Sequence, residues 1–115
     1  MKFFLLNYFC KYACICIFIY YFIGAKGFKE RFDIIHNVMG IPHQRIADFP
    51  DVLLTRAFKL KERHEYLVFL NRAQYDPKKP NFISLQDIAT TNDQDFCQRC
   101  AKTSVAQFND FLKTR

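Results

Sequence analysis

Basic side chains at helical spacing are the part of this sequence best suited to bind a ligand. Arg56, Lys59 and Arg63 recur at intervals that place them on one face of a helix. Such a face can neutralise successive phosphates of a nucleic acid, which are recognised by charge and position. A solvated face is the alternative, because Glu62 and Glu65 are interleaved with these bases. The candidate nucleic-acid contacts are Arg45, Arg56, Lys59, Lys61, Arg63, Arg72, Lys78 and Lys79.

Two cysteines, Cys97 and Cys100, have the CxxC spacing that serves zinc binding or thiol exchange. Zinc needs two further ligands, and the three histidines, at 36, 43 and 64, all lie far away in sequence. Thiol exchange normally uses such a pair at the start of a helix that follows a strand. We therefore interpret both thiols as small packing residues on one face of a helix.

Catalytic chemistry finds no support in the sequence. No nucleophile, base and orienting group can be assembled, and three glycines in the whole chain form no phosphate-cradling loop. We therefore predict no enzymatic activity, no metal, no cofactor and no small-molecule substrate. The formal charge of +6 falls to +3 over residues 28–115, because Lys2, Lys11 and Lys26 precede them. This excess permits an anionic partner without requiring one.

One apolar stripe and one glycine define the first predicted helix of residues 28–115. Phe28, Phe32, Ile35 and Met39 are spaced to fall on one helix face. Gly40 is expected to end this helix, because a residue without Cβ adopts the left-handed conformation at little cost.

Two prolines predict a short second helix and a turn. Pro42 suits the first turn of a helix over residues 42–49. Pro50 cannot continue that helix and biases Phe49 away from helical geometry. A turn beginning at Pro50 should then carry Leu53 inward. The predicted structural motif comprises Gly40, Pro42, Pro50 and Leu53.

The remaining residues also favour helices. Thr55 is expected to cap a central helix that runs to about Ala73. A loop held open by Pro77 and Pro80 should follow it. Three capping boxes then pair Ser84 with Asp87, Thr91 with Gln94, and Ser104 with Gln107. No segment alternates like a strand, so the chain is predicted to be all-α.

Residues 1–26 form a separate apolar segment with three open interpretations. Residues 3–25 are long enough to cross a hydrocarbon core of about 30 Å as a helix, although Asn7 and Lys11 weaken that case. The segment could instead be a targeting segment, although it has no arginine. Seventeen of the first 27 residues are Phe, Ile, Tyr, Lys or Asn, whose codons are A/T-rich, so a gene-model artefact is the third interpretation.

The stretch IADFPDVL at residues 46–53 resembles the signature of the mitochondrial transcription termination factor (mTERF) family. Three further stretches resemble the C-terminal part of the family's third subfamily: FDIIHNVM at 32–39, FKLKERH at 58–64 and RAQYDPKKPNFISL at 72–85. Residues 111–113, FLK, resemble its closing residues. The resemblance covers about residues 28–115.

This resemblance implies an α-solenoid of three-helix repeats with a basic concave side. It also implies a mitochondrial factor that regulates transcription and its termination, takes part in large-ribosomal-subunit assembly, and has double-stranded DNA and/or ribosomal RNA as partners. The chain would hold one complete repeat plus a C-terminal cap, after an apolar N-terminal helix. Because solenoids need about three repeats for stability, we expect a truncated form in which Phe28 and Phe32 face a missing neighbour. The alternative is a single-pass membrane protein, anchored through residues 3–25, with a small helical interaction domain.

Overall fold

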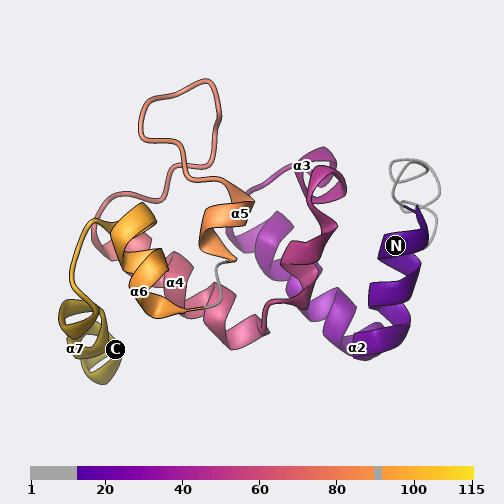
Figure 1. The fold of residues 1–115 in the computed structure, drawn as a ribbon, viewed down its shortest axis with the longest axis horizontal. Helices are drawn as coiled ribbons and strands as arrows, with labels where there is room; N and C mark the ends of the chain where they lie inside the picture. Colours follow the sequence, from indigo (N-terminus) through magenta and orange to yellow (C-terminus); the bar gives the residue numbers. More distant parts are fainter. Residues whose placement is uncertain (1–12, 90–91) are drawn as a thin grey trace. The chain divides into compact units, whose positions relative to one another are not determined.

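Two helical units make up the chain, Met1–Ala57 and Phe58–Arg115, and each has its own packing. The computed structural model describes residues 13–89 and 92–115 (Figure 1). Every regular element within those two ranges is helical. The all-α prediction is therefore confirmed.

The first unit begins with a helix that is broken at a glycine. Helix α2 (Ala13–Asp33) changes direction in Figure 1, and Gly24 within it has φ 82° and ψ 164°. Only glycine occupies this backbone region readily. The π-helix η1 (Ile34–Val38) follows directly. The break lies next to the last residue of the apolar segment predicted at residues 3–25, and residues 1–12 lie outside the described part of the chain.

The break at Gly24 brings the residues before it onto Phe28. The rings of Tyr20 and Phe28 meet edge to face with centroids 5.4 Å apart, whereas eight residues of a straight helix rise about 12 Å. Ile19, Phe28 and Phe32 are all buried. The expectation that Phe28 and Phe32 face a missing neighbour is therefore wrong, because Tyr20 packs on Phe28 and the ring centroid of His43 lies 5.1 Å from that of Phe32.

Replacing Gly24 by alanine should lower the free energy of unfolding by about 1–3 kcal/mol, because alanine must be strained to keep this backbone conformation. A Cβ at Gly24 meets no atom within 4 Å, so the effect isolates the backbone. Gly27→Ala is the matched control. Its Cβ makes only ordinary contact with Ile23, at 3.6 Å, and the change should stabilise the helix by about 0.5–1 kcal/mol. Urea unfolding followed by circular dichroism measures both; equal effects would contradict the bend.

The apolar stripe and the glycine stop are confirmed. Phe28, Phe32, Ile35 and Met39 are all buried. Gly40 has φ 74°, and the N–H of Ile41 after it donates to the carbonyl of Ile35 at 3.1 Å. The helix therefore ends where the sequence predicts.

The two prolines act largely as predicted. Helix α3 (His43–Asp48) starts after Pro42, which precedes the first helical residue and does not lie within the first turn. Phe49 has φ −140° and ψ 73°, and the 3-10 helix η2 (Pro50–Leu54) begins at the second proline. Leu53 within it is fully buried. The predicted turn is confirmed, with Pro42 shifted by one position.

The second unit is built on α4 (Ala57–Phe69). Thr55 ends η2, and Arg56 rather than Thr55 directly precedes the first residue of α4. The helix also stops short of the predicted Ala73. Asn71 takes a left-handed φ of 59°, and the N–H of Arg72 turns back to the carbonyl of Leu67 at 2.8 Å. A left-handed asparagine is a common substitute for glycine at a helix end, and the prediction missed it.

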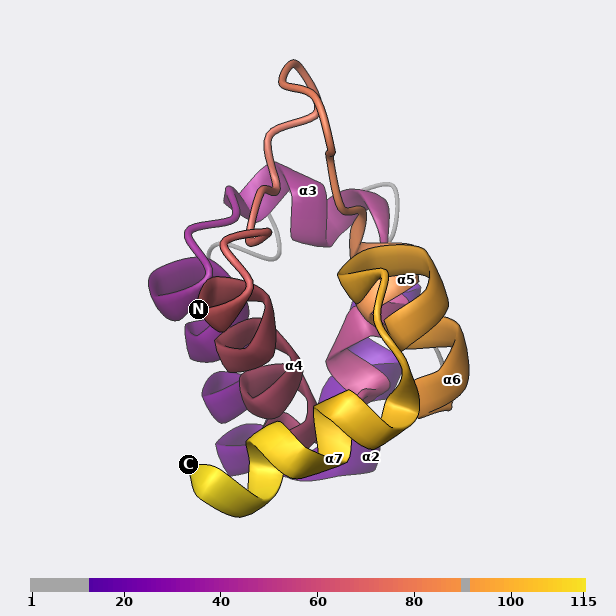
Figure 2. The ribbon, with the colours of Figure 1, turned by 90° about the vertical axis from the view of Figure 1, so that its left-hand side faces the viewer.

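Three further helical segments pack around α4. Helix α5 (Leu85–Ile88) is followed by α6 (Asp93–Phe96), which runs into the π-helix η3 (Cys97–Ala101), and α7 (Val105–Thr114) closes the chain. Helix α7 lies against α4 in Figure 2. Aromatic rings join the two helices: the ring centroid of Tyr66 is 4.8 Å from that of Phe108 and 5.1 Å from that of Phe111. These contacts join α7 to the core of the unit, in which Tyr66 and Phe108 are buried.

Side-chain caps start the short helices; of the three predicted capping boxes, the one at Ser104 is complete, and the one at Ser84 has only the cap bond. Ser84 accepts the N–H of Asp87 at 3.2 Å. Ser104 and Gln107 form a reciprocal capping box. The box assigned to Thr91 lies outside the described residues. Asn92 caps α6, and its side chain accepts the N–H of Asp95 at 2.7 Å.

No helix within residues 13–89 and 92–115 combines the length and the apolar character required to traverse a bilayer.

Candidate nucleic-acid interface

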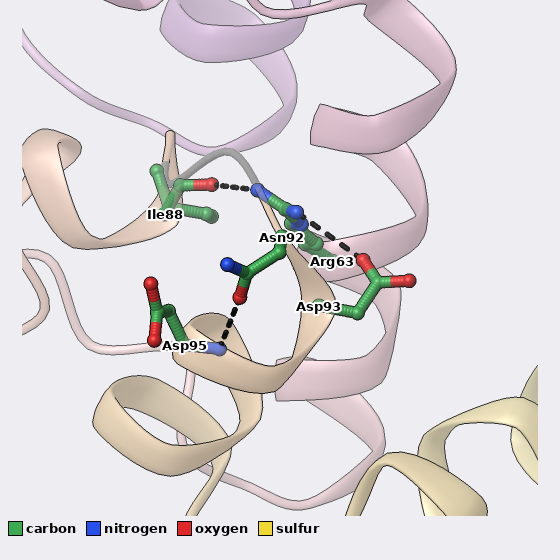
Figure 3. Close-up of polar contacts among 5 residues, drawn as sticks. All are labelled: Arg63, Ile88, Asn92, Asp93 and Asp95. Carbon is green, nitrogen blue, oxygen red and sulfur yellow. Dashed lines mark hydrogen bonds and ion pairs between the residues drawn. The ribbon is translucent and has the colours of Figure 1, made fainter.

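Arg63 lies inside the second unit and not on its surface. Its side chain is 1% exposed. As Figure 3 shows, Nη1 donates to the carbonyl of Ile88 at 2.7 Å and Nη2 pairs with Oδ1 of Asp93 at 3.2 Å. The guanidinium also lies 5.2 Å from the ring centroid of Phe96. Arg63 therefore ties α4 to α5 and α6, and we withdraw it as a phosphate contact.

The predicted face of Arg56, Lys59 and Arg63 does not form. Arg56 is exposed but precedes α4 and belongs to the first unit. Lys59 is half-buried and Lys61 exposed, both on α4. Arg45 is half-buried on α3 in the first unit. Helical spacing places residues on one face, but it does not say which face the core covers.

Three other candidates lie on the segment that joins α4 to α5, which projects from the helices in Figure 1. Arg72, Lys78 and Lys79 are exposed there. Hydrogen bonds close this loop: Gln74 accepts the N–H of Asp76 at 2.6 Å and donates to the carbonyl of Pro80 at 3.1 Å. The loop predicted to be held open by prolines is instead ordered by an amide side chain.

A histidine on α4 anchors the same loop. Nδ1 of His64 and the hydroxyl of Tyr75 are 2.7 Å apart. Burial raises the pKa of Tyr75 and lowers the pKa of His64. Both groups are therefore held neutral, and the hydrogen bond between them fixes the position of the loop on the helix.

Two basic residues absent from the sequence-based set join Arg72. Arg99 on η3 and Lys102 just after it are exposed, and with Arg72 they line a cavity of about 200 Å³. Closure of the loop and the end of η3 bring these three together. In the sequence, the only hint of this cluster was the position of Arg99 between the two cysteines of the CxxC pair.

The cysteine pair packs inside the unit, as predicted. Cys97 and Cys100 are buried free thiols. Burial raises the pKa of Cys100 to about 12; Asp87 adds to this, while Arg63, Lys102 and Arg99 act against it. Burial also raises the pKa of Cys97, so both thiols stay protonated near neutral pH. Across residues 13–89 and 92–115, no cluster of His, Cys, Asp and Glu is large enough to hold a metal ion.

Three known proteins that are similar to this chain share a name. No protein-family model matches it. Over 91 residues it is 54% identical to "Transcription termination factor 3, mitochondrial" of Rattus norvegicus, and over 89 residues it is 53% identical to the protein of that name from Mus musculus. These alignments cover 79% and 77% of this chain and 22% of each relative.

The protein of the same name from Drosophila melanogaster is 48% identical over 93 residues, which are 81% of this chain and 26% of that protein. The chain thus spans about a quarter of the length of these curated relatives. In each of the three alignments, about half of the aligned residues are identical to those of this chain. The described residues are also all-α. This chain belongs to the mitochondrial transcription termination factor family.

Proposed function

We propose that this chain binds nucleic acid and regulates mitochondrial transcription. The observation that carries the proposal is the set of exposed bases on the second unit, where Lys78 and Lys79 project on the closed loop and Arg72 lies at its start. Phosphates attract such side chains without regard to base sequence. The relatives' name, which refers to transcription termination in mitochondria, supports this assignment and the mitochondrial location.

The exposed lysines of the loop differ from the basic residues that hold the fold together, because the latter form ion pairs within the protein. Arg63 pairs with Asp93, and Arg115 pairs with Glu62 and Glu65 at 3.6 and 2.8 Å. The side chains of Lys78 and Lys79 make no ion pair with any residue in the part of the chain that the structure describes. Their charge is therefore available to a polyanion.

The partner we propose is double-stranded DNA and/or ribosomal RNA. The ordered loop supports either, because its lysines act as point charges on a fixed scaffold and carry no preference for base or sugar. If the partner is ribosomal RNA, the role that we propose for the chain is in assembly of the large ribosomal subunit.

Binding of the 115-residue chain to a fluorescent duplex should be tight at low salt and weaken steeply as salt rises. Reversing Lys78 and Lys79 to Glu should lower the affinity by at least about tenfold and flatten the dependence on salt by roughly one unit per lost phosphate contact. Fluorescence anisotropy titrations from 50 to roughly 200 mM salt measure both quantities.

Lys26→Glu with Lys113→Glu changes the net charge equally and is the matched control, because both lysines are exposed and lie outside the candidate set. Absence of binding at low salt would refute the proposal. Equal losses in the two double variants would show that only net charge matters.

A further inference from the structure

Two adjoining cavities lie beside the loop of the second unit. The larger, of about 350 Å³, is lined by Leu70, Asn71, Arg72, Gln74, Pro80 and Asn81. The smaller is the cavity of about 200 Å³ around Arg72, Arg99 and Lys102, and Asn81 also lines it. Arg72 and Asn81 belong to both. The pair therefore forms one site with a basic compartment and a compartment of amide and apolar groups.

The basic compartment gathers three cations and no acid. Among the residues that line it, no aspartate or glutamate appears. The side chains of Arg72, Arg99 and Lys102 make no hydrogen bond or ion pair to any other residue within 13–89 and 92–115. The three positive charges repel one another, and an anion bound between them would be attracted to all three and offset that repulsion. The compartment is suited to a phosphate group.

One residue of the site, Lys102, occupies a backbone conformation that is costly for its type. Lys102 ends η3 in the left-handed conformation, with φ 58° and ψ 36°. Glycine is the usual residue at such a helix end, and other residues are strained there. Asn71 and Asn81 are also left-handed, with φ 59° and 61°. These three are the non-glycine residues with positive φ in the described ranges, and all three line the two cavities. The left-handed backbone at Lys102 therefore has an energetic cost that a glycine would avoid.

The larger compartment offers a different chemistry. Gln74 is occupied by the loop, since its amide already bonds Asp76 and Pro80. Asn71 and Asn81 are exposed and line the cavity beside the apolar side chains of Leu70 and Pro80. Amides with apolar neighbours suit a sugar and a base, as in other small-molecule sites where few polar groups orient a largely apolar ligand.

We propose that the two cavities bind one unpaired nucleotide of a nucleic-acid strand, with its phosphate among Arg72, Arg99 and Lys102 and its sugar and base in the larger compartment. This inference rests on the proposed function and names the form of nucleic acid that the site takes. Bases of a duplex are stacked and paired, whereas those of a single strand can enter a protein cavity. The concave shape and the shared Arg72 and Asn81 therefore favour a single strand.

The experiment compares a labelled single-stranded RNA with a duplex of the same sequence, bound to the 115-residue chain by fluorescence anisotropy at one salt concentration. The double variant Arg99→Gln with Lys102→Gly should bind the single strand at least about tenfold more weakly, because charge-assisted hydrogen bonds to phosphate are lost. Duplex affinity should change by less than about threefold, since the surface lysines remain.

Stability and charge controls accompany this comparison. Lys102→Gly alone should raise the melting temperature by relieving the left-handed strain, so weaker binding by that variant cannot come from unfolding. Lys26→Gln with Lys113→Gln removes the same charge and should leave both affinities nearly unchanged. Adenosine monophosphate should compete with the single strand at lower concentration than adenosine, which lacks the phosphate.

The outcomes separate the two proposals. If the wild type binds nucleic acid but the double variant binds the single strand normally, or loses both ligands equally, the nucleotide site is refuted and the proposed function stands. If the wild type binds neither strand form, both are refuted. Selective loss of the single strand together with competition by the monophosphate supports the site.

Discussion

Replacing Arg63 by alanine is expected to lower the free energy of unfolding of the second unit by about 3–5 kcal/mol. The change removes a side chain that is 1% exposed, leaves a cavity against Phe96, and deprives the buried carbonyl of Ile88 of its donor. An unpaired buried acceptor alone costs about 1–3 kcal/mol. Since Arg63 joins three helices, the loss should be felt in α5 and α6 as well as α4.

Asp93→Asn is the informative control for Arg63. The Asp93 side chain is 46% exposed, so water can replace its partner and the expected loss is about 1 kcal/mol or less. Guanidinium unfolding gives the overall change, and hydrogen exchange at the amides of α5 and α6 locates it. A stable Arg63→Ala protein with weakened nucleic-acid binding would reverse our assignment of this arginine to the interior.

Leu53→Ala should lower the free energy of unfolding of the first unit by about 2–5 kcal/mol. Leu53 is completely buried, and its carbonyl accepts a hydrogen bond from Nη1 of Arg31 at 2.8 Å, which fastens η2 to α2. The substitution leaves a cavity at this junction. The backbone carbonyl remains, so the loss reports packing and not the hydrogen bond.

The neighbouring leucine supplies the control for Leu53. Leu54 is 46% exposed, and its replacement by alanine should cost less than about 1 kcal/mol. Both variants have the same chemical change one residue apart, so their difference measures burial. Similar losses in urea unfolding would contradict the inward turn that begins at Pro50.

The sequence predicted those features of the fold that depend on local backbone sterics. Gly40 and Pro50 restrict φ wherever they occur, and the helix end and the turn lie at these residues. Ser104 and Gln107 likewise cap a helix through bonds within four residues. Family membership was also predictable, because the signature at residues 46–53 can be recognised from the residues alone.

Features that depend on distant partners were not predictable. Arg63 shares its helix with charged residues on several sides, and its partner Asp93 lies thirty positions later. Periodicity therefore could not show which charged residue enters the core. The bend at Gly24 lies near the end of an apolar run, and it is shown by the backbone angles of Gly24 and by the ring contact of Tyr20 with Phe28. Arg99 and Lys102 meet Arg72 only because the loop folds back.

The bend at Gly24 has a consequence for what else can stack on Phe28. Tyr20, which covers Phe28, is tethered to that face by a short stretch of chain, so it acts at an effective concentration in the millimolar range or above. A helix from another molecule, or from a distant part of a longer chain, must outcompete this tethered cover before it gains any apolar contact there. Packing of a further helix on Phe28 therefore requires that Tyr20 be displaced from it. The equilibrium of that exchange depends on the length of the tether as well as on how well the new helix fits the surface.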